Sequence, residues 1–164
     1  MSVLVISYSR HDQPLVRAIV SLLKTALRNI EKAIYWDGDF EPGDPWFEQI
    51  REHIDAAPQL FVFWCWRSAT SEQVRREFEY AFERHKRVVP VLLDSTPLSP
   101  ELAPIHGIDL RSVVFHDEPI PKYEPIPIDG DPLWEEGTEI RRFRDVRMIR
   151  NKSHVIQQFS VYLD

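Results

Sequence analysis

The chain has 164 residues, of which 43% are hydrophobic and 28% charged, and its formal net charge is −6. This length predicts one domain with a core large enough to fold without disulfides. The single cysteine, Cys65, excludes an internal disulfide framework and favours a reducing, cytoplasmic compartment. No apolar run reaches the ~18 residues that span a bilayer, and the first residues lack the basic start of a secretion signal. The acidic balance argues against a nucleic-acid binder.

Segments typical of strands and helices alternate along the first two thirds of the chain. Short apolar runs predict strands over 3–6, 33–36, 60–64, 88–93 and 112–115. Apolar residues at helical spacing predict helices over 15–30, 46–54 and 71–82, and a closing helix over 155–163. Asp12 lies where the first of these helices is capped, and Pro14 is tolerated in its first turn. Pro90, inside the fourth strand, indicates an edge strand or a bulge.

This alternation predicts an α/β fold in which a parallel sheet of about five strands is covered by helices on both faces. Parallel sheets of this kind bind ligands beyond the carboxyl ends of their strands. In this chain those ends carry the polar and aromatic residues of segments 7–10, 37–46 and 65–71. We therefore expect the functional site at that edge of the sheet.

Charge and proline divide the remaining third of the chain. Residues 117–139 contain eight acids, one lysine and five prolines, which predicts an extended surface segment over 117–133. Residues 141–152 contain six Arg or Lys and one acid. This basic stretch either binds a phosphate or membrane surface or forms a solvated face beside the acidic segment. The predicted organisation is a core over 1–116, an acidic proline-rich segment over 117–140, and a basic segment with the closing helix over 141–164.

Several chemistries are excluded by the motifs that are missing. The chain has five glycines and no GxGxxG after the first strand, and it has no GK[ST] phosphate-binding loop. The six histidines show no HExxH or paired spacing, and one cysteine cannot build a cysteine-type zinc site, so no metal site is expected. Cys65 can form a catalytic pair with a histidine, but a lone cysteine at the end of a buried strand is typically a packing residue.

Three short motifs together resemble Toll/interleukin-1 receptor (TIR) domains. Residues 5–9 (VISYS) resemble the first-strand signature of that family. Residues 35–37 (YWD), with EPG at 41–43 and Trp46, resemble its second strand and BB loop. Residues 71–77 (SEQVRRE), with Ala81 and RVVPV at 87–91, resemble the segment of the catalytic glutamate and the fourth strand in bacterial TIR proteins. The motifs occur in the family's order over roughly 3–115, but Gln73 stands where many members have a tryptophan.

The resemblance implies a flavodoxin-like fold and an enzymatic activity. Catalytic TIR domains cleave the nicotinamide–ribose bond of NAD⁺ to nicotinamide and ADP-ribose or a cyclic isomer. The resemblance assigns Glu77 as the catalytic carboxylate, and its spacing from Val74 and Ala81 predicts a position at the edge of the helix's buried stripe. NAD⁺ is then the substrate, and no cofactor or metal is expected. The implied role is that of an effector in a prokaryotic antiviral or stress NAD-depletion or signalling system.

The substrate-binding candidates lie in the predicted loops at the strand ends. They are Tyr8, Ser9, Arg10, Asp37, Phe40, Gly43 and Trp46. Arg10 either meets the pyrophosphate or is a solvated loop charge, and Asp37 either contacts ribose or caps the loop. The three aromatic residues can stack on nicotinamide or adenine, although a tryptophan that starts a helix is typically a core residue. Gly43 is expected to serve the bend of its loop.

The resemblance also implies partners. Family members work in assemblies in which a neighbour's BB loop completes the site, so we expect self-association, or binding to other TIR domains, through residues 37–45. The alternative function is a non-catalytic TIR scaffold for homotypic interaction. A third possibility is a flavodoxin-like nucleotide-binding or receiver domain.

Overall fold

The computed structural model describes residues 4–26, 34–36, 46–114, 116 and 149–163. The strands are β1 (Leu4–Ser7), β2 (Ile34–Tyr35), β3 (Gln59–Trp64), β4 (Arg87–Leu92) and β5 (Ile108–Asp109). The helices are α1 (Gln13–Ala26), α2 (Trp46–Ala56), α3 (Glu72–Glu83) and α5 (Lys152–Leu163), with short 3-10 helices η1 (Arg10–Asp12) and η2 (Ser68–Thr70). All strands are parallel, in the order β2-β1-β3-β4-β5. This is the flavodoxin-like order and confirms the expected fold class.

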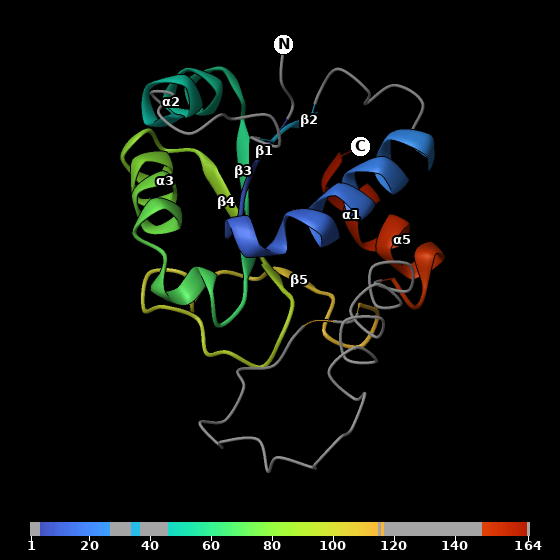
Figure 1. Ribbon diagram of the computed structural model, residues 1–164. Coiled ribbons are helices and arrows are strands. Elements are labelled where there is room, and N and C mark those ends of the chain that lie inside the picture. Colours follow the sequence, from blue (N-terminus) through green and yellow to red (C-terminus); the bar gives the residue numbers. More distant parts are fainter. Residues whose placement is uncertain (1–3, 27–33, 37–45, 115, 117–148, 164) are drawn as a thin grey trace, which may run out of the picture.

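Helices cover both faces of the sheet. Figure 1 shows α2 and α3 on one side and α1 and α5 on the other. Successive strand residues point to opposite faces, so a strand buried on both sides is apolar throughout. Leu4, Ile6, Phe61, Phe63, Val89 and Val91 belong to the cluster under α1 and α5, whereas Val5, Leu60, Val62, Trp64 and Val88 belong to the cluster under α2 and α3.

Two helix starts follow from the sequence as expected. Ser71 caps α3, and its Oγ accepts a hydrogen bond from the Val74 backbone N–H at 3.2 Å. Pro14 lies in the first turn of α1, where its missing N–H costs nothing. The helix expected over 15–30 is described as far as Ala26, and residues 27–30 lie outside the described part. In the described residues, no helix combines the length and hydropathy of a membrane span.

The fifth strand was expected in the wrong place. It is Ile108–Asp109, and the carbonyl of Leu110 accepts hydrogen bonds from the N–H groups of Val113 and Val114, so the chain turns where a strand was expected. Val114 forms an isolated antiparallel bridge with Ile149. Residues 113 and 114 are buried in the cluster under α1 and α5, which explains an apolar run that pairs with no neighbouring parallel strand.

Pro90 marks neither an edge nor a bulge. β4 lies between β3 and β5, and its register with β3 runs one to one from Arg87 to Leu92. The ladder with β5 begins at Val91, so Pro90 lies just before it and does not have to donate a hydrogen bond there. The expected segments over 117–133 and 141–148 lie outside the described residues, and their organisation stays a prediction.

Gly107 precedes β5 at a point of close backbone approach. A Cβ on this residue would overlap the carbonyl oxygen of Pro90 and lie 2.7 Å from its Cγ. We expect Gly107→Ala to lower the free energy of unfolding by about 1–3 kcal/mol, because the β4 backbone must shift. Chemical denaturation checks this, with His106→Ala, an exposed neighbour, as the control expected to change stability by less than ~0.5 kcal/mol. An unchanged Gly107→Ala protein would show that this approach relaxes at no cost.

Candidate functional site

Chain segments that follow β1, β3 and β4 meet at the carboxyl edge of the sheet. β1 and β3 are neighbours in the sheet, although β2 comes between them in sequence. From β1 the chain first adds a strand on one side of the sheet, β2, and then adds β3, β4 and β5 on the other side, so the strand order reverses between β1 and β3. Parallel sheets open a crevice for ligands at such a point. η1 follows β1 there, and Cys65 and η2 follow β3. This edge carries one group of candidate residues, and α3 beside it carries the other.

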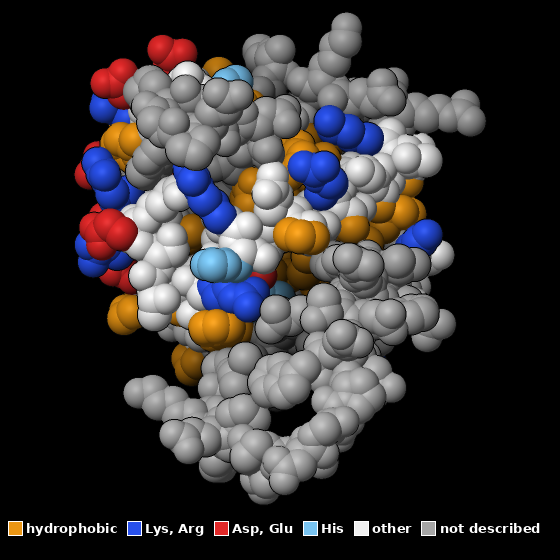
Figure 2. Space-filling view, in the orientation of Figure 1, with side chains coloured by type: hydrophobic (Ala, Val, Ile, Leu, Met, Phe, Trp, Pro, Cys, Tyr) orange, Lys and Arg blue, Asp and Glu red, His pale blue; other side chains and the backbone are white. Residues whose placement is uncertain are grey.

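Glu77 is the buried acid of α3. Its exposed fraction is 1%, whereas Glu72, Glu79 and Glu83 on the same helix are exposed. Glu72 and Glu79 form ion pairs with Arg75, at 2.8 and 3.9 Å. Figure 2 shows acidic and basic side chains interspersed along the edge that α2 and α3 form. Glu77 thus lies within the buried face of α3, deeper than the expected edge of the stripe.

Gln73 contacts Glu77 one helical turn away. Its Nε2 donates a hydrogen bond to Oε1 of Glu77 at 3.3 Å. Residues four apart lie on the same face of a helix, so this contact follows directly from the spacing. At the position where many TIR domains have a tryptophan, this chain therefore provides an amide donor to the carboxylate.

The three candidates after β1 have different surroundings. Tyr8 is 4% exposed and lies in the cluster under α1 and α5, where its ring packs at 6.2 Å from that of Trp36. Ser9 is buried, and its carbonyl accepts a hydrogen bond from the Asp12 N–H at 2.8 Å. Arg10 is exposed at the start of η1. Tyr8 thus packs on the face of the sheet opposite to α3, and Arg10 is the one of the three that faces solvent.

Four candidates belong to the segment that resembles the BB loop. Asp37, Phe40 and Gly43 lie outside the described residues. Trp46 begins α2, and its side chain is also outside the described part. The substrate-binding roles of these four residues stay predictions.

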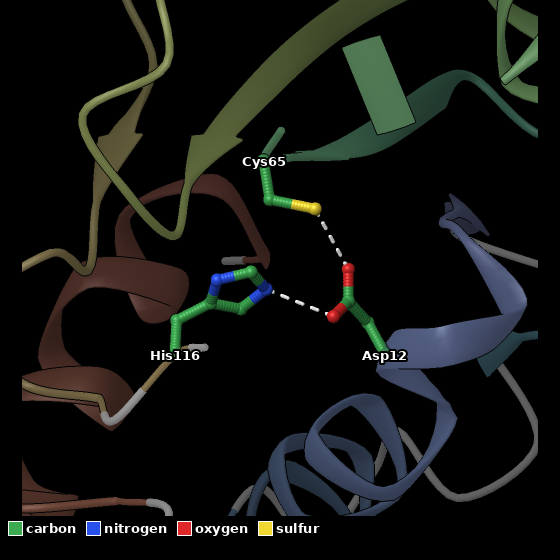
Figure 3. Close-up of side chains that lie close together, drawn as sticks. All are labelled: Asp12, Cys65 and His116. Atoms are coloured by element: carbon green, nitrogen blue, oxygen red, sulfur yellow. Dashed lines mark hydrogen bonds and ion pairs between the residues drawn. The ribbon is translucent and has the colours of Figure 1, made fainter. Parts of the chain in front are cut away.

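Three buried side chains that the sequence did not predict to be neighbours meet beyond the carboxyl ends of β1 and β3 (Figure 3). Asp12 ends η1, Cys65 follows β3, and His116 follows the bridge residue Val114. The Cys65 thiol donates to Oδ2 of Asp12 at 2.9 Å, and Nε2 of His116 lies 2.8 Å from Oδ1. The exposed fractions are 3% for Asp12, 0% for Cys65 and 4% for the His116 side chain.

The charges in this cluster stabilise one another. Burial alone lowers the pKa of His116, but the hydrogen bonds to Asp12 and Cys65 and the charge of Asp12 raise it to about 10. Burial alone raises the pKa of Asp12, but the hydrogen bonds from His116 and Cys65, with the charges of His116 and Arg67, lower it below its ordinary value. Asp12 and His116 therefore form a buried ion pair at neutral pH.

Further polar groups fix the cluster from outside. The Arg67 guanidinium lies 3.5 Å from Oδ1 of Asp12, and the Ser68 N–H lies 3.5 Å from Sγ of Cys65. Asp94 lies on the other side of the imidazole ring from Asp12, with its Oδ2 3.6 Å from Nδ1 of His116. Its carboxylate accepts hydrogen bonds from the backbone N–H groups of Trp66, at 3.0 Å, and Thr96, at 2.9 Å.

No local motif could have revealed this cluster. Cys65 and His116 come 53 and 104 residues after Asp12, and none of the three stands in a recognisable spacing with another. The signal that was available is their position: Asp12 and Cys65 closely follow β1 and β3, whose carboxyl ends meet at one edge. A pairing of Cys65 with a histidine was considered from sequence; the structure joins Cys65 to His116 through Asp12.

Comparisons with known proteins identify the family. The model of the TIR domain family matches residues 4–121. The TIR domain of the Toll-related receptor TRR-2 from Hydra magnipapillata aligns with a TM-score of 0.58 at 14% identity, covering 88% of this chain and 98% of that one. The TIR domains of the activated Roq1 resistosome, which directly recognizes the pathogen effector XopQ, align with a TM-score of 0.50 at 15% identity, covering 85% and 98%. No curated protein matches the chain. At these identities the structures show the fold, and the family model spans most of the chain, so this chain belongs to the TIR domain family.

Proposed function

We propose that this TIR domain cleaves the nicotinamide–ribose bond of NAD⁺ and that Glu77 is its catalytic carboxylate. The observation that carries the proposal is the burial of Glu77 on a helix whose other acids face solvent. A carboxylate out of water is costly, and chains retain one where its charge is used. Glu77 also lies in the motif that resembles the catalytic segment of bacterial TIR proteins, which supports a catalytic role for its charge.

Cleavage of the nicotinamide–ribose bond requires a fixed negative charge near the ribose rather than a general acid. When the bond between the nicotinamide nitrogen and the ribose C1′ breaks, positive charge develops on the ribose, as in an oxocarbenium ion. A carboxylate beside the ribose stabilises that charge and accepts hydrogen bonds from the ribose hydroxyls. Nicotinamide leaves as a neutral molecule, so no general acid is needed. Water that adds to C1′ gives ADP-ribose and releases a proton; a nucleophile within the same molecule gives a cyclic product.

Gln73 acts in this proposal as a positioning residue. Its amide donates to Oε1 of Glu77 and so restricts the rotation of the carboxylate. Preorganised charge stabilises a transition state better than a freely rotating group, because no reorientation is needed as the bond breaks. Gln73 thus supports Glu77 from within α3.

The proposed setting is an effector of a prokaryotic antiviral or stress response that depletes NAD⁺ in the cytoplasm. The substrate itself supplies the leaving group, so the proposal includes no cofactor. The deciding experiment is incubation of concentrated protein with NAD⁺, followed by chromatography for nicotinamide and ADP-ribose. Nicotinamide release that is absent from an identically prepared Glu77→Gln sample supports the enzyme. No release at any protein concentration would favour the scaffold that only binds other TIR domains.

Activity is expected to rise with protein concentration. The sequence predicts a turn-rich loop over 37–45, with two prolines and two glycines, that is suited to docking on a neighbour. A site completed by that neighbour is present only in the assembly. Specific activity measured over a dilution series, beside sedimentation, should therefore fall about tenfold or more on passing from assembly to monomer.

Gly43→Ala tests whether activity depends on assembly through residues 37–45. A Cβ in the bend of the loop should reduce assembly and cleavage together. Specific activity that stays constant in a monomeric sample would exclude a shared site. Lost activity with intact assembly would place residues 37–45 in substrate binding within one subunit.

A further inference from the structure

We propose that Asp12, Cys65 and His116 form a binding site for a divalent transition-metal ion of the zinc class. One potential ligand atom from each of the three side chains lies within 4.8 Å of the other two. A tetrahedral ion with bonds of about 2.0–2.3 Å holds its ligand atoms roughly 3.3–3.8 Å apart. Side-chain rotations would therefore have to open the 2.8 and 2.9 Å contacts of Asp12 and bring the three atoms to these separations. The proposal does not depend on the function assigned to Glu77.

The donor set selects the metal. A thiolate, an imidazole nitrogen and a carboxylate oxygen are the three ligand types that Zn²⁺ takes in proteins. Mg²⁺ and Ca²⁺ bind oxygen ligands, and the thiolate of Cys65 disfavours both. With three protein ligands, the fourth position of a tetrahedral site is left for a water molecule.

An outer layer of groups already orients the histidine as a metal ligand. Histidine ligands usually donate their second ring N–H to a carboxylate, which fixes the ring and raises its basicity. Nδ1 of His116 is buried and makes no hydrogen bond within the described residues, and Oδ2 of Asp94 lies 3.6 Å from it. The backbone N–H groups of Trp66 and Thr96 hold that carboxylate in place. Asp94 is thus positioned to accept Nδ1–H once Nε2 binds a metal.

The cluster can balance the charge of a bound Zn²⁺. The carboxylates of Asp12 and Asp94 and the thiolate of Cys65 supply three negative charges, and the Arg67 guanidinium, 3.5 Å from Oδ1 of Asp12, supplies one positive charge. Together with one Zn²⁺ these charges sum to zero. Metal binding therefore leaves no uncompensated charge in the interior.

The proposed ion joins three segments that are distant in sequence. It would connect η1, the turn between β3 and η2, and the segment after β5, beyond the carboxyl ends of β1 and β3. Figure 3 shows the three side chains pointing toward one another. All three ligands are buried, so the ion would lie inside the fold and away from bulk solvent. A ligand that binds only the folded chain raises its stability, so the ion is expected to stabilise this edge.

The test is metal binding by the purified protein after chelator treatment and removal of the chelator. We expect one equivalent of Zn²⁺ in calorimetry and a rise of several degrees in the unfolding midpoint at excess metal. Co²⁺ in place of Zn²⁺ should give a thiolate-to-metal charge-transfer band. Because Cys65 is the single cysteine of the chain, that band would identify Cys65 as a ligand of the bound Co²⁺ without any mutation.

Matched variants establish the remaining ligands. Cys65→Ser should abolish the charge-transfer band and weaken Zn²⁺ binding by about a hundredfold or more, because the thiolate is lost. Asp94→Asn should weaken binding by about tenfold to a hundredfold, as loss of a supporting carboxylate does at other sites. His106→Gln, at an exposed histidine, should bind as the wild type does. Absence of a stoichiometric site in the wild-type protein, or a Co²⁺ spectrum without the thiolate band, would overturn the proposal.

Discussion

Glu77→Gln is expected to slow NAD⁺ cleavage by at least about a hundredfold while the protein stays folded. Glutamine keeps the size of the side chain and removes the charge that, in the proposed mechanism, stabilises the developing cation on the ribose. If Glu77 acts only in the transition state, kcat falls and KM changes little. Nicotinamide release measured by chromatography over a range of NAD⁺ concentrations separates the two constants.

The stability of the variants follows from the burial of Glu77. An exposed acid on a helix could be replaced at a cost below ~0.5 kcal/mol. Glu77 is 1% exposed and accepts a hydrogen bond from Gln73, so Glu77→Ala leaves a cavity and a donor without its acceptor, which cost about 1–3 kcal/mol. Glu77→Gln avoids the cavity and is the variant to assay. Glu79→Gln, at an exposed acid two residues further, is the control expected to keep full activity and stability. Wild-type turnover by folded Glu77→Gln would exclude Glu77 as the catalytic residue.

Apolar runs and helical spacing made most of the fold predictable. β1, β3 and residues 88–91 of β4 are buried on both faces, and such strands show as mainly apolar runs in the sequence. α3 begins directly after Ser71, the residue at which the sequence places the start of that helix. The expected strand over 112–115 was wrong because Val113 and Val114 are apolar for another reason, namely burial in the cluster under α1 and α5. An apolar run indicates that its side chains are buried, but it does not indicate whether its backbone pairs with a neighbouring strand.

The candidate site was predictable only where its residues are neighbours in sequence. Glu77 and Gln73 lie one turn apart on α3, so their contact could be expected from the spacing. Asp12 and His116 are 104 residues apart and meet only because β1 and β3 are adjacent and the segment after β5 returns to them. The topology, rather than any local pattern, creates that ion pair.

In metal-free buffer with a chelator, His116→Gln is expected to lower the free energy of unfolding by about 3 kcal/mol at pH 6, because it removes one partner of a buried ion pair. The pKa of His116 rises from its ordinary 6.5 to about 10 on folding, so the folded chain binds more protons than the unfolded chain between these values. The contribution of His116 is therefore complete below pH 6.5 and is lost as the pH rises towards 10. The pKa of Asp12 is lowered, so its contribution is present above its ordinary 3.8 and is lost in acid.

Wild-type stability should thus fall between pH 6.5 and 10, and His116→Gln should lack that fall, so the two proteins approach each other at alkaline pH. The pKa of His53 is lowered by burial, and its contribution changes only below 6.5, outside this window. Urea denaturation followed by circular dichroism at pH 6, 8 and 10 measures the difference, with His106→Gln as the control that keeps the wild-type slope. If the wild type and His116→Gln lose stability in parallel across these pH values, the Asp12–His116 ion pair does not hold η1 to the segment after β5.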